Sequence, residues 1–296
     1  MKNISRRGFV ATSCAAAGAM MASGSRASEE EKNTIDMKRP GRTANTKFAC
    51  NLEMWWRDRP FLERICLAAE LGYPAIEFWP WRGKDIDAAA ALTQELGIAV
   101  AQFTASGNIA NPANHATFVQ NVKDAIPVAK KLGAKKACVV AGEMVDGMTE
   151  RDLQDQCVVA LKKVAPMCEN NDLMLILEPL NIRVDHPGQC VYRSDDAIRI
   201  CQEVGSTHVK INWDLYHQQI TEGDLCGRLR EGFEQIGYLQ LADHPGRNEP
   251  GTGEIYYPRV LQEAYELGYR GYVGLELRPK TTELAAAIAI AKADIW

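Results

Sequence analysis

Two glutamates stand where a carboxylate is costly to bury. Glu178 ends the most apolar stretch of the chain, L-M-L-I-L-E-P-L, and Glu276 lies inside Y-V-G-L-E-L-R-P. An ionised carboxylate in such a place costs several kcal/mol unless a cation or hydrogen-bond donors compensate it. Asp214 in I-N-W-D and Gln240 in Y-L-Q-L-A-D occupy comparable positions. These four oxygen-bearing side chains indicate one shared functional site.

Three carboxylates brought together cannot all stay ionised without a counter-charge, and a divalent cation is one solution. Oxygen ligands without Cys or His suit a hard ion, Mg²⁺ or Mn²⁺, rather than structural zinc. Taken singly, each acid has another explanation, because it could cap a helix or pair with an arginine such as Arg183 or Arg278. Four acceptors at corresponding positions favour the metal site.

The elements that would position these residues are eight short apolar runs that alternate with amphipathic helical patterns. This alternation predicts a parallel sheet with helices outside, and eight strands favour a closed (β/α)₈ TIM barrel, α/β in class, over an open sheet. No G-x-G-x-x-G or Walker loop follows a strand. Functional residues of such a barrel lie at the carboxyl ends of the strands. The predicted strands are Phe48–Met54, Ala75–Trp79, Ala99–Phe103, Ala137–Val140, Leu173–Glu178, Val209–Asp214, Tyr238–Ala242 and Tyr272–Leu277.

The first residues resemble an export signal. S-R-R-G-F-V contains a twin-arginine pair, an Ala-rich apolar run follows, and Ser25-Arg26-Ala27 fits a small-x-small cleavage site. We therefore expect an export signal over 1–27, a polar linker over 28–46, a single barrel domain over 47–296, and a periplasmic protein. The apolar run is shorter than the roughly 20 residues of a membrane span, so no permanent span is expected. The alternative is an unstructured N-terminus that carries two arginines by coincidence.

Charge argues against a nucleic-acid partner. The 296-residue chain has a net charge of −4. Loss of residues 1–27 would remove four of the 34 basic residues and none of the 38 acidic ones, which leaves a net charge near −8. Proteins that bind phosphate backbones usually carry a basic face. The nine cysteines include no C-x-x-C pair and are interpreted as small buried hydrophobes.

Several motifs together resemble the hydroxypyruvate isomerase family. They are A-C-N-L-E-M-W-W, A-I-E-F-W, L-E-P-L-N, K-I-N-W-D-L-Y-H-Q-Q, G-Y-L-Q-L-A-D-H-P-G-R-N-E-P-G-T-G-E-I and G-L-E-L-R-P. The family is one branch of the sugar-phosphate isomerase/epimerase-like barrels of the xylose isomerase-like superfamily, which also include ketose 3-epimerases and type-IV endonucleases. The resemblance runs from about Phe48 to Lys280 and is strongest in the second half.

The resemblance implies roles for particular residues. Glu178, Asp214, Gln240 and Glu276 would bind the divalent metal, and the two glutamates would be the proton-transfer pair. Related epimerases have histidine where Gln240 stands, which favours the hydroxypyruvate isomerase branch. His217 and Arg247 would bind substrate oxygens.

Three further residues are candidates for substrate contact. Glu77 ends the second predicted strand, although an ion pair with Arg82 would explain it equally well. His186 and His244 lie in loops that should overhang the same end of the barrel.

The implied function is isomerisation of an α-hydroxy carbonyl compound through an enediolate, with hydroxypyruvate and tartronate semialdehyde as the expected pair, or a related sugar or sugar acid. A ketose 3-epimerase would use the same metal site, and a non-catalytic periplasmic sugar-binding barrel would keep the fold alone. The expected partner is a small-molecule substrate. Family members often associate, which favours a homo-oligomer.

Overall fold

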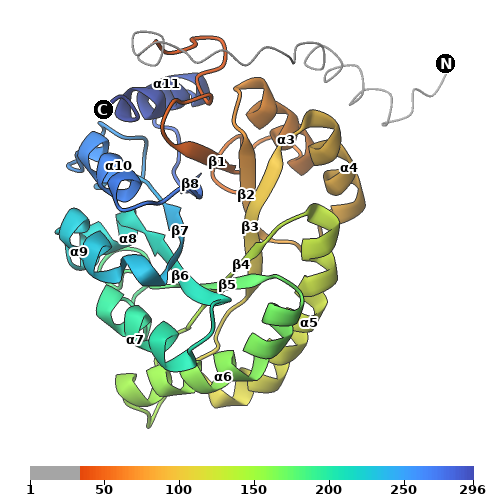
Figure 1. Cartoon of the computed structure of the whole chain (residues 1–296), viewed down its shortest axis with the longest axis vertical. Coiled ribbons are helices and arrows are strands. Elements are labelled where there is room, and N and C mark those ends of the chain that lie inside the picture. The colour runs from red at the N-terminus through yellow and green to blue at the C-terminus, as the bar shows by residue number, and fades with distance from the viewer. Residues whose placement is uncertain (1–33) are drawn as a thin grey trace.

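A computed structural model describes residues 34–296 of the chain. Eight parallel strands follow one another around a closed barrel in the order β1 to β8, with each strand bonded to its neighbours in sequence and β8 bonded to β1 (Figure 1). The predicted (β/α)₈ barrel is confirmed. The strands are β1 Lys47–Asn51, β2 Ala75–Pro80, β3 Ala99–Ser106, β4 Lys136–Val140, β5 Met174–Glu178, β6 Val209–Asp214, β7 Ile236–Gln240 and β8 Tyr272–Leu275.

The helices form a ring around the strands (Figure 1). Three of them end at a glycine in the left-handed conformation, where a side chain would be strained: Gly97 at φ 64°, Gly133 at φ 66° and Gly205 at φ 72°. The helices are α3 Phe61–Glu70, α4 Ile86–Leu96, α5 His115–Leu132, α6 Glu150–Asn170, α7 Ser194–Val204, α8 Leu215–Thr221, α9 Leu225–Gly232, α10 Tyr257–Glu266 and α11 Glu283–Ala293, with short 3₁₀ turns at Pro112–Asn114 and Phe233–Gln235.

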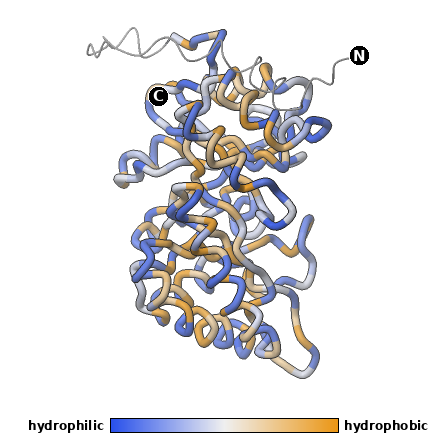
Figure 2. The backbone as a smooth tube through the Cα atoms, turned by 90° about the vertical axis from the view of Figure 1, so that its right-hand side faces the viewer, coloured by the Kyte–Doolittle hydropathy of each residue, from blue (hydrophilic) through white to orange (hydrophobic). Residues whose placement is uncertain are grey.

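Hydrophobic residues fall into two cores. The larger one lies between the helices and the outer faces of the strands, and it forms because residues alternate between the two faces of each strand. In Figure 2, hydrophobic and hydrophilic residues accordingly alternate at short intervals along the chain. The smaller core fills part of the barrel interior with small side chains and one tyrosine: Ala49, Ala75, Ala101, Cys138, Ile176 and Tyr238.

A polar layer occupies the rest of the interior. Asn51, Glu77, Gln102, Asn212 and Gln240 are almost completely buried on neighbouring strands. Strand register places the first three side by side, since Asn51 pairs with Glu77 and Glu77 with Gln102. The interior of the barrel is therefore apolar in one part and hydrogen-bonded in the next.

The segment before the barrel packs against it. Asp294 Oδ2, just after α11, accepts the backbone N–H groups of Asn45 and Thr46 at 2.9 and 3.0 Å, and Gly41 N donates to Leu71 O at 2.8 Å. Residues 34–46, which the sequence assigns to a linker, thus lie along the end of the barrel where the strands begin. The predicted export signal, residues 1–27, lies outside the described residues.

Two further sequence predictions concern the described part of the chain. None of the eight cysteines in residues 34–296 forms a disulfide, and seven of them are buried, as expected for small hydrophobes. Among the same residues, no helix is both long and apolar enough to cross a membrane.

Candidate active site

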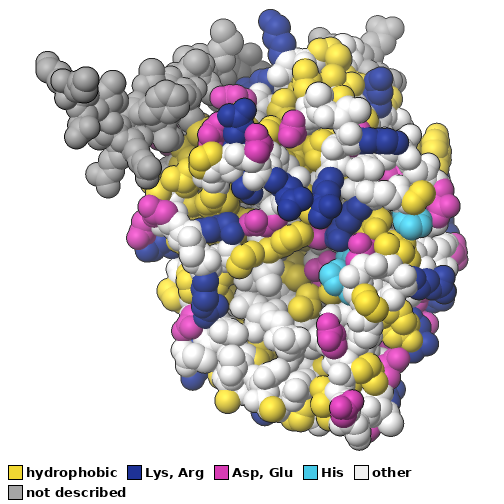
Figure 3. Space-filling view, turned by 180° about the vertical axis from the view of Figure 1, so that it is seen from behind, with side chains coloured by type: hydrophobic (Ala, Val, Ile, Leu, Met, Phe, Trp, Pro, Cys, Tyr) yellow, Lys and Arg dark blue, Asp and Glu magenta, His cyan; other side chains and the backbone are white. Residues whose placement is uncertain are grey.

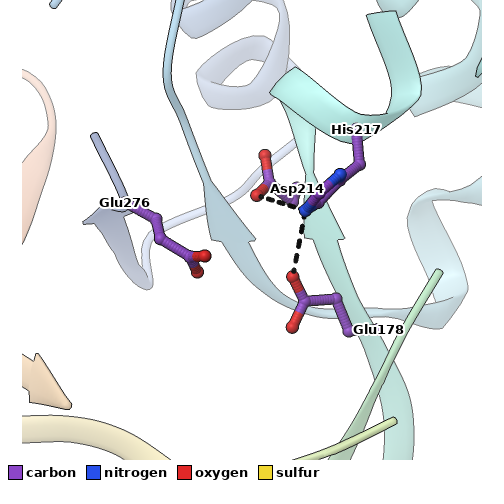
Figure 4. Close-up of side chains that lie close together, drawn as sticks. All are labelled: Glu178, Asp214, His217 and Glu276. Atoms are coloured by element: carbon purple, nitrogen blue, oxygen red, sulfur yellow. Dashed lines mark ion pairs between the residues drawn. The ribbon is translucent and has the colours of Figure 1, made fainter. Parts of the chain in front are cut away.

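Four buried side chains converge at the carboxyl end of the barrel. Glu178 ends β5, Asp214 ends β6, His217 lies in the first turn of α8, and Glu276 follows β8. One potential ligand atom from each lies within 4.8 Å of all the others. Figure 4 shows Glu276 approaching from one side and the other three from the opposite side. The structure thus brings together the acids that the sequence places at strand ends.

Asp214 has one carboxylate oxygen without a hydrogen-bond partner. Its Oδ1 caps α8 by accepting from Tyr216 N at 2.8 Å, whereas the buried Oδ2 accepts no hydrogen bond from any described residue. Oδ2 lies 3.6 Å from His217 Nε2 and 3.7 Å from Arg247 Nη2. Burial raises the pKa of Asp214 to about 6, with Arg247 acting in the opposite direction. A buried acceptor left open in this way is a place for a cation.

Arg247 supplies positive charge to the cluster. Its guanidinium donates to Glu276 Oε1 and lies with its Cζ 5.0 Å from the Tyr216 ring centre. The residue adopts a positive φ of 55°, which is strained for a non-glycine residue and aims the side chain at the acids. Neither Arg183 nor Arg278 forms an ion pair with Glu178 or Glu276 within residues 34–296.

The two glutamates bear raised pKa values. Burial, and after it the neighbouring Asp214, raises the pKa of Glu178 to about 8. Burial also raises the pKa of Glu276 well above its ordinary value, opposed by Arg247 and reinforced by Glu178. Such shifts are typical of groups that exchange protons near neutral pH.

Gln240 lies beside the cluster and connects it to the barrel interior. Its Nε2 donates to Glu276 Oε2 at 2.5 Å and to Glu77 Oε1 at 2.9 Å, and its Oε1 accepts from Asn212 Nδ2 at 2.6 Å. The amide therefore presents hydrogen-bond donors to both acids. In this arrangement its oxygen faces Asn212.

Glu77 is enclosed by neutral donors. Besides Gln240, its carboxylate accepts hydrogen bonds from Asn51 at 2.8 Å, Gln102 at 3.1 Å and Tyr238 at 2.8 Å, and the residue is fully buried. Burial raises its pKa and the four hydrogen bonds oppose the shift. The alternative ion pair with Arg82 is wrong.

Arg82 instead reaches across the surface to Asp124, at 2.9 Å. Strand direction explains the difference, because Glu77 points into the barrel while Arg82 lies beyond the end of β2. The acid is accordingly satisfied from inside the barrel.

The three histidines expected to contact substrate occupy different positions. His217 Nε2 lies 3.8 Å from Glu178 Oε1, inside the cluster, and burial lowers its pKa well below the ordinary value, helped by Arg247 and His186. The half-buried His186 ring lies 5.4 Å from that of His217. His244 contacts Tyr216, with ring centres 5.8 Å apart. His217 is therefore in the cluster, and His186 and His244 lie around it.

Two residues that contact Glu178 and His217 were not predicted from the sequence. Cys138 Sγ donates to Glu178 Oε2 at 3.2 Å from the neighbouring strand β4. Asn181, part of L-E-P-L-N, contacts His217 Nδ1 through both its backbone and its side chain. Period-two alternation in β4 could have placed Cys138 inside the barrel, but no local signal marks Asn181.

Charged side chains of both signs lie on one face of the molecule. On the face shown in Figure 3, acidic side chains are interspersed with Lys and Arg. Several Lys and Arg side chains lie next to one another near the middle of this face, with acidic side chains beside them.

The xylose isomerase-like TIM barrel family model matches residues 65–293. The chain belongs to this family. It is 33% identical to the hydroxypyruvate isomerase of Escherichia coli, over 80% of this chain and 95% of that protein. It is 32% identical to the 2-oxo-tetronate isomerase of Cupriavidus necator, over 79% of this chain and 93% of the relative. These relationships make the protein an isomerase.

Solved structures of other proteins have the same fold. A family 2 AP endonuclease from Brucella melitensis superposes with a TM-score of 0.78 at 27% identity, over 81% of this chain and 96% of that one. The 3-keto-D-glucoside 4-epimerase of E. coli superposes with a TM-score of 0.72 at 22% identity, over 84% and 98%. At 22% identity, the second match bears on the fold alone.

Proposed function

We propose that this isomerase is metal-dependent and acts on a small α-hydroxy carbonyl acid, with hydroxypyruvate and 2-oxo-tetronate as the first substrates to test. The observation that carries the proposal is the buried cluster of Glu178, Asp214 and Glu276 around an open carboxylate oxygen. The two substrates come from the names of the relatives.

The donor set fits a hard divalent cation. Asp214 Oδ2 is buried without a hydrogen bond, and oxygens of Glu178 and Glu276 lie close to it. These three carboxylates would hold Mg²⁺ or Mn²⁺. Gln240 is the fourth candidate, and ligation through its oxygen requires the amide to turn away from Glu77 and Glu276. When bound, the ion would polarise the substrate carbonyl and acidify the neighbouring C–H.

The two glutamates are suited to move the proton. They extend from β5 and from the end of β8 toward the same space, on different sides of it (Figure 4). One carboxylate removes a proton from carbon, and the other, protonated at the start, gives a proton to the neighbouring carbon. The hydroxyl proton passes to the former carbonyl oxygen, which completes the exchange of carbonyl and hydroxyl. Without a cation, burial and Asp214 raise the pKa of Glu178 to about 8, and a bound cation would lower it because it favours the ionised carboxylate.

Arg247 and His217 would hold the substrate. A guanidinium binds a carboxylate through two parallel hydrogen bonds, and that of Arg247 already contacts carboxylates in the cluster. The carboxylate of a bound substrate would share the Arg247 guanidinium with the carboxylates of the cluster. His217 presents Nε2 toward the same space and can contact a hydroxyl or carbonyl oxygen.

The test is proton exchange in D₂O, monitored by NMR, for hydroxypyruvate, 2-oxo-tetronate and a panel of ketoses, with and without a chelator. Isomerase activity places solvent deuterium on the carbon that carried the original carbonyl, and the chelator abolishes this labelling. Glu178→Gln and Glu276→Gln should both lose exchange. Glu70→Gln, at an exposed position of α3, is the matched control. Normal exchange in either cluster variant would contradict the assignment.

The same experiment separates the remaining alternatives. A 3-epimerase returns the proton to the opposite face of the same carbon, so the ketose label appears without a change of carbonyl position. A binding protein shows saturation without exchange. Export to the periplasm and association of subunits stay predictions.

A further inference from the structure

The Nδ1 atom of His217 faces two hydrogen-bond donors. Asn181 Nδ2 lies 2.6 Å away and Asn181 N lies 3.3 Å away. Both His217 and Asn181 are completely buried, so water does not compete for this nitrogen. A backbone N–H can only donate, and the ring nitrogen opposite it must therefore carry a lone pair.

The orientation of the Asn181 amide is also determined. Its Oδ1 accepts from the backbone N–H groups of Val184 at 2.9 Å and Asp185 at 3.2 Å, and its Nδ2 donates to Asp185 Oδ2 at 2.8 Å. A rotated amide would set its oxygen against a carboxylate and its NH₂ group against two N–H donors. Three separate contacts therefore place Nδ2, a donor, against His217.

These contacts decide where the proton of a neutral imidazole lies. Because Nδ1 accepts hydrogen bonds, the proton is on Nε2. Nε2 faces acceptors, Asp214 Oδ2 at 3.6 Å and Glu178 Oε1 at 3.8 Å. Arg247 Nη2 lies 3.4 Å from Nε2. Because this arginine nitrogen already donates a hydrogen bond to Glu276, it does not require His217 Nε2 as an acceptor.

We propose that Asn181 is a positioning residue that holds His217 in the Nε2–H tautomer, so that His217 acts as a hydrogen-bond donor to a substrate oxygen and not as a metal ligand. A metal ligand needs a free lone pair on Nε2, and this tautomer removes it. His217 therefore has a different role from the three acids around it, although it lies close enough to them to bind the same metal ion. The statement about the substrate rests on the proposed function, whereas the statement about the tautomer does not.

The sharpest test exchanges two side chains. In Asn181→Asp/Asp185→Asn, the pair keeps its mutual hydrogen bond and its net charge, but an acceptor replaces the donor opposite His217 Nδ1. Asp185→Asn alone is the matched control, because Asn181 still faces the ring and Tyr216 retains a side-chain partner at position 185.

The readout is the tautomer of His217 by ¹⁵N NMR on protein without substrate, assigned by comparison with His217→Asn. We expect Nε2–H in the wild type and the control, and Nδ1–H in the exchanged pair. Adding Mg²⁺ should leave the Nε2 proton of the wild type in place. Nδ1–H in the wild type, loss of the Nε2 proton on adding Mg²⁺, or an unchanged tautomer in the exchanged pair would overturn the proposal.

Kinetics provide a second readout. The exchanged pair should lose about 10- to 100-fold in kcat/KM, more than Asn181→Ala, because it stabilises the wrong tautomer. A purely structural role predicts the opposite order, since the exchange preserves the loop contacts that alanine removes, and that order would overturn the proposal. If no tested substrate turns over while the tautomers are as expected, the proposed function fails and the role of Asn181 stands.

Discussion

Glu77 and Glu276 are both buried acids joined through one amide, that of Gln240, yet their surroundings differ. Glu77 accepts hydrogen bonds from four neutral side chains and is completely enclosed. Glu276 lies among other carboxylates and is balanced by Arg247, which approaches from a loop. The first acid is bonded by four neutral side chains, whereas the second is bonded by the Gln240 amide and by the Arg247 guanidinium. A buried acid is therefore a candidate for chemistry when it lies among other carboxylates and beside a cationic side chain, and a structural one when neutral donors enclose it.

The largest effect should come from the cluster. Glu276→Gln is expected to lower turnover about a thousandfold, since general acid–base catalysis contributes roughly 10²- to 10⁴-fold. The free energy of unfolding of the metal-free variant should stay equal or rise, because one of several like charges is removed. Urea unfolding in chelator measures this. A marked loss of stability would show that Glu276 is structural.

Glu77→Gln should give the opposite result in stability. Its donors would face an amide that offers only one acceptor atom, so we expect a loss of about 2–4 kcal/mol in the free energy of unfolding. The same urea titration measures it, with Glu70→Gln as control. Unchanged stability would remove the contrast between the two acids.

The pH dependence of stability tests the cluster as a group. Burial raises the pKa of Glu178 to about 8 and that of Asp214 to about 6, from ordinary values of 4.5 and 3.8. The folded state therefore keeps protons that the unfolded chain has lost, and the stability they contribute disappears as pH rises toward 8. His217, whose pKa is lowered, destabilises the fold only below its ordinary value of 6.5.

The interval from pH 6.5 to 8 accordingly isolates the acids. In chelator, we expect the free energy of unfolding to fall by about 1–2 kcal/mol across it. Mg²⁺ should reverse the fall, because it stabilises the ionised carboxylates. Thermal unfolding at both pH values measures this, and a stability that rises with pH in chelator would contradict it.

The smallest effect concerns the thiol beside Glu178. Cys138→Ala removes the donor at 3.2 Å and a small buried volume, and about 1 kcal/mol of stability should be lost. Cys138→Ser restores a donor and should recover part of it. Equal stability of the alanine and serine variants would mean that the hydrogen bond to Glu178 contributes nothing.

The success of the sequence-based predictions follows from periodicity. Strand boundaries agree within a few residues, and β7 begins two residues before the predicted Tyr238. In a parallel barrel all strands end on the same side, so Glu178, Asp214 and Gln240 had to lie near one another once the fold was known. The sequence was less informative about which side chains contact each other. Arg82 was the nearest basic residue in sequence to Glu77, but the two point to different environments.

The sequence by itself determined the barrel, the burial of its acids and the end of the barrel at which they gather, because alternation and strand count depend on local pattern. Only the tertiary structure decided which arginine balances Glu276, that Glu77 is satisfied by neutral donors, and that Asn181 faces His217. These pairings join residues up to 163 positions apart, as between Glu77 and Gln240, and no local pattern records them. They arise when the barrel closes and sets the interior faces of all eight strands against one another.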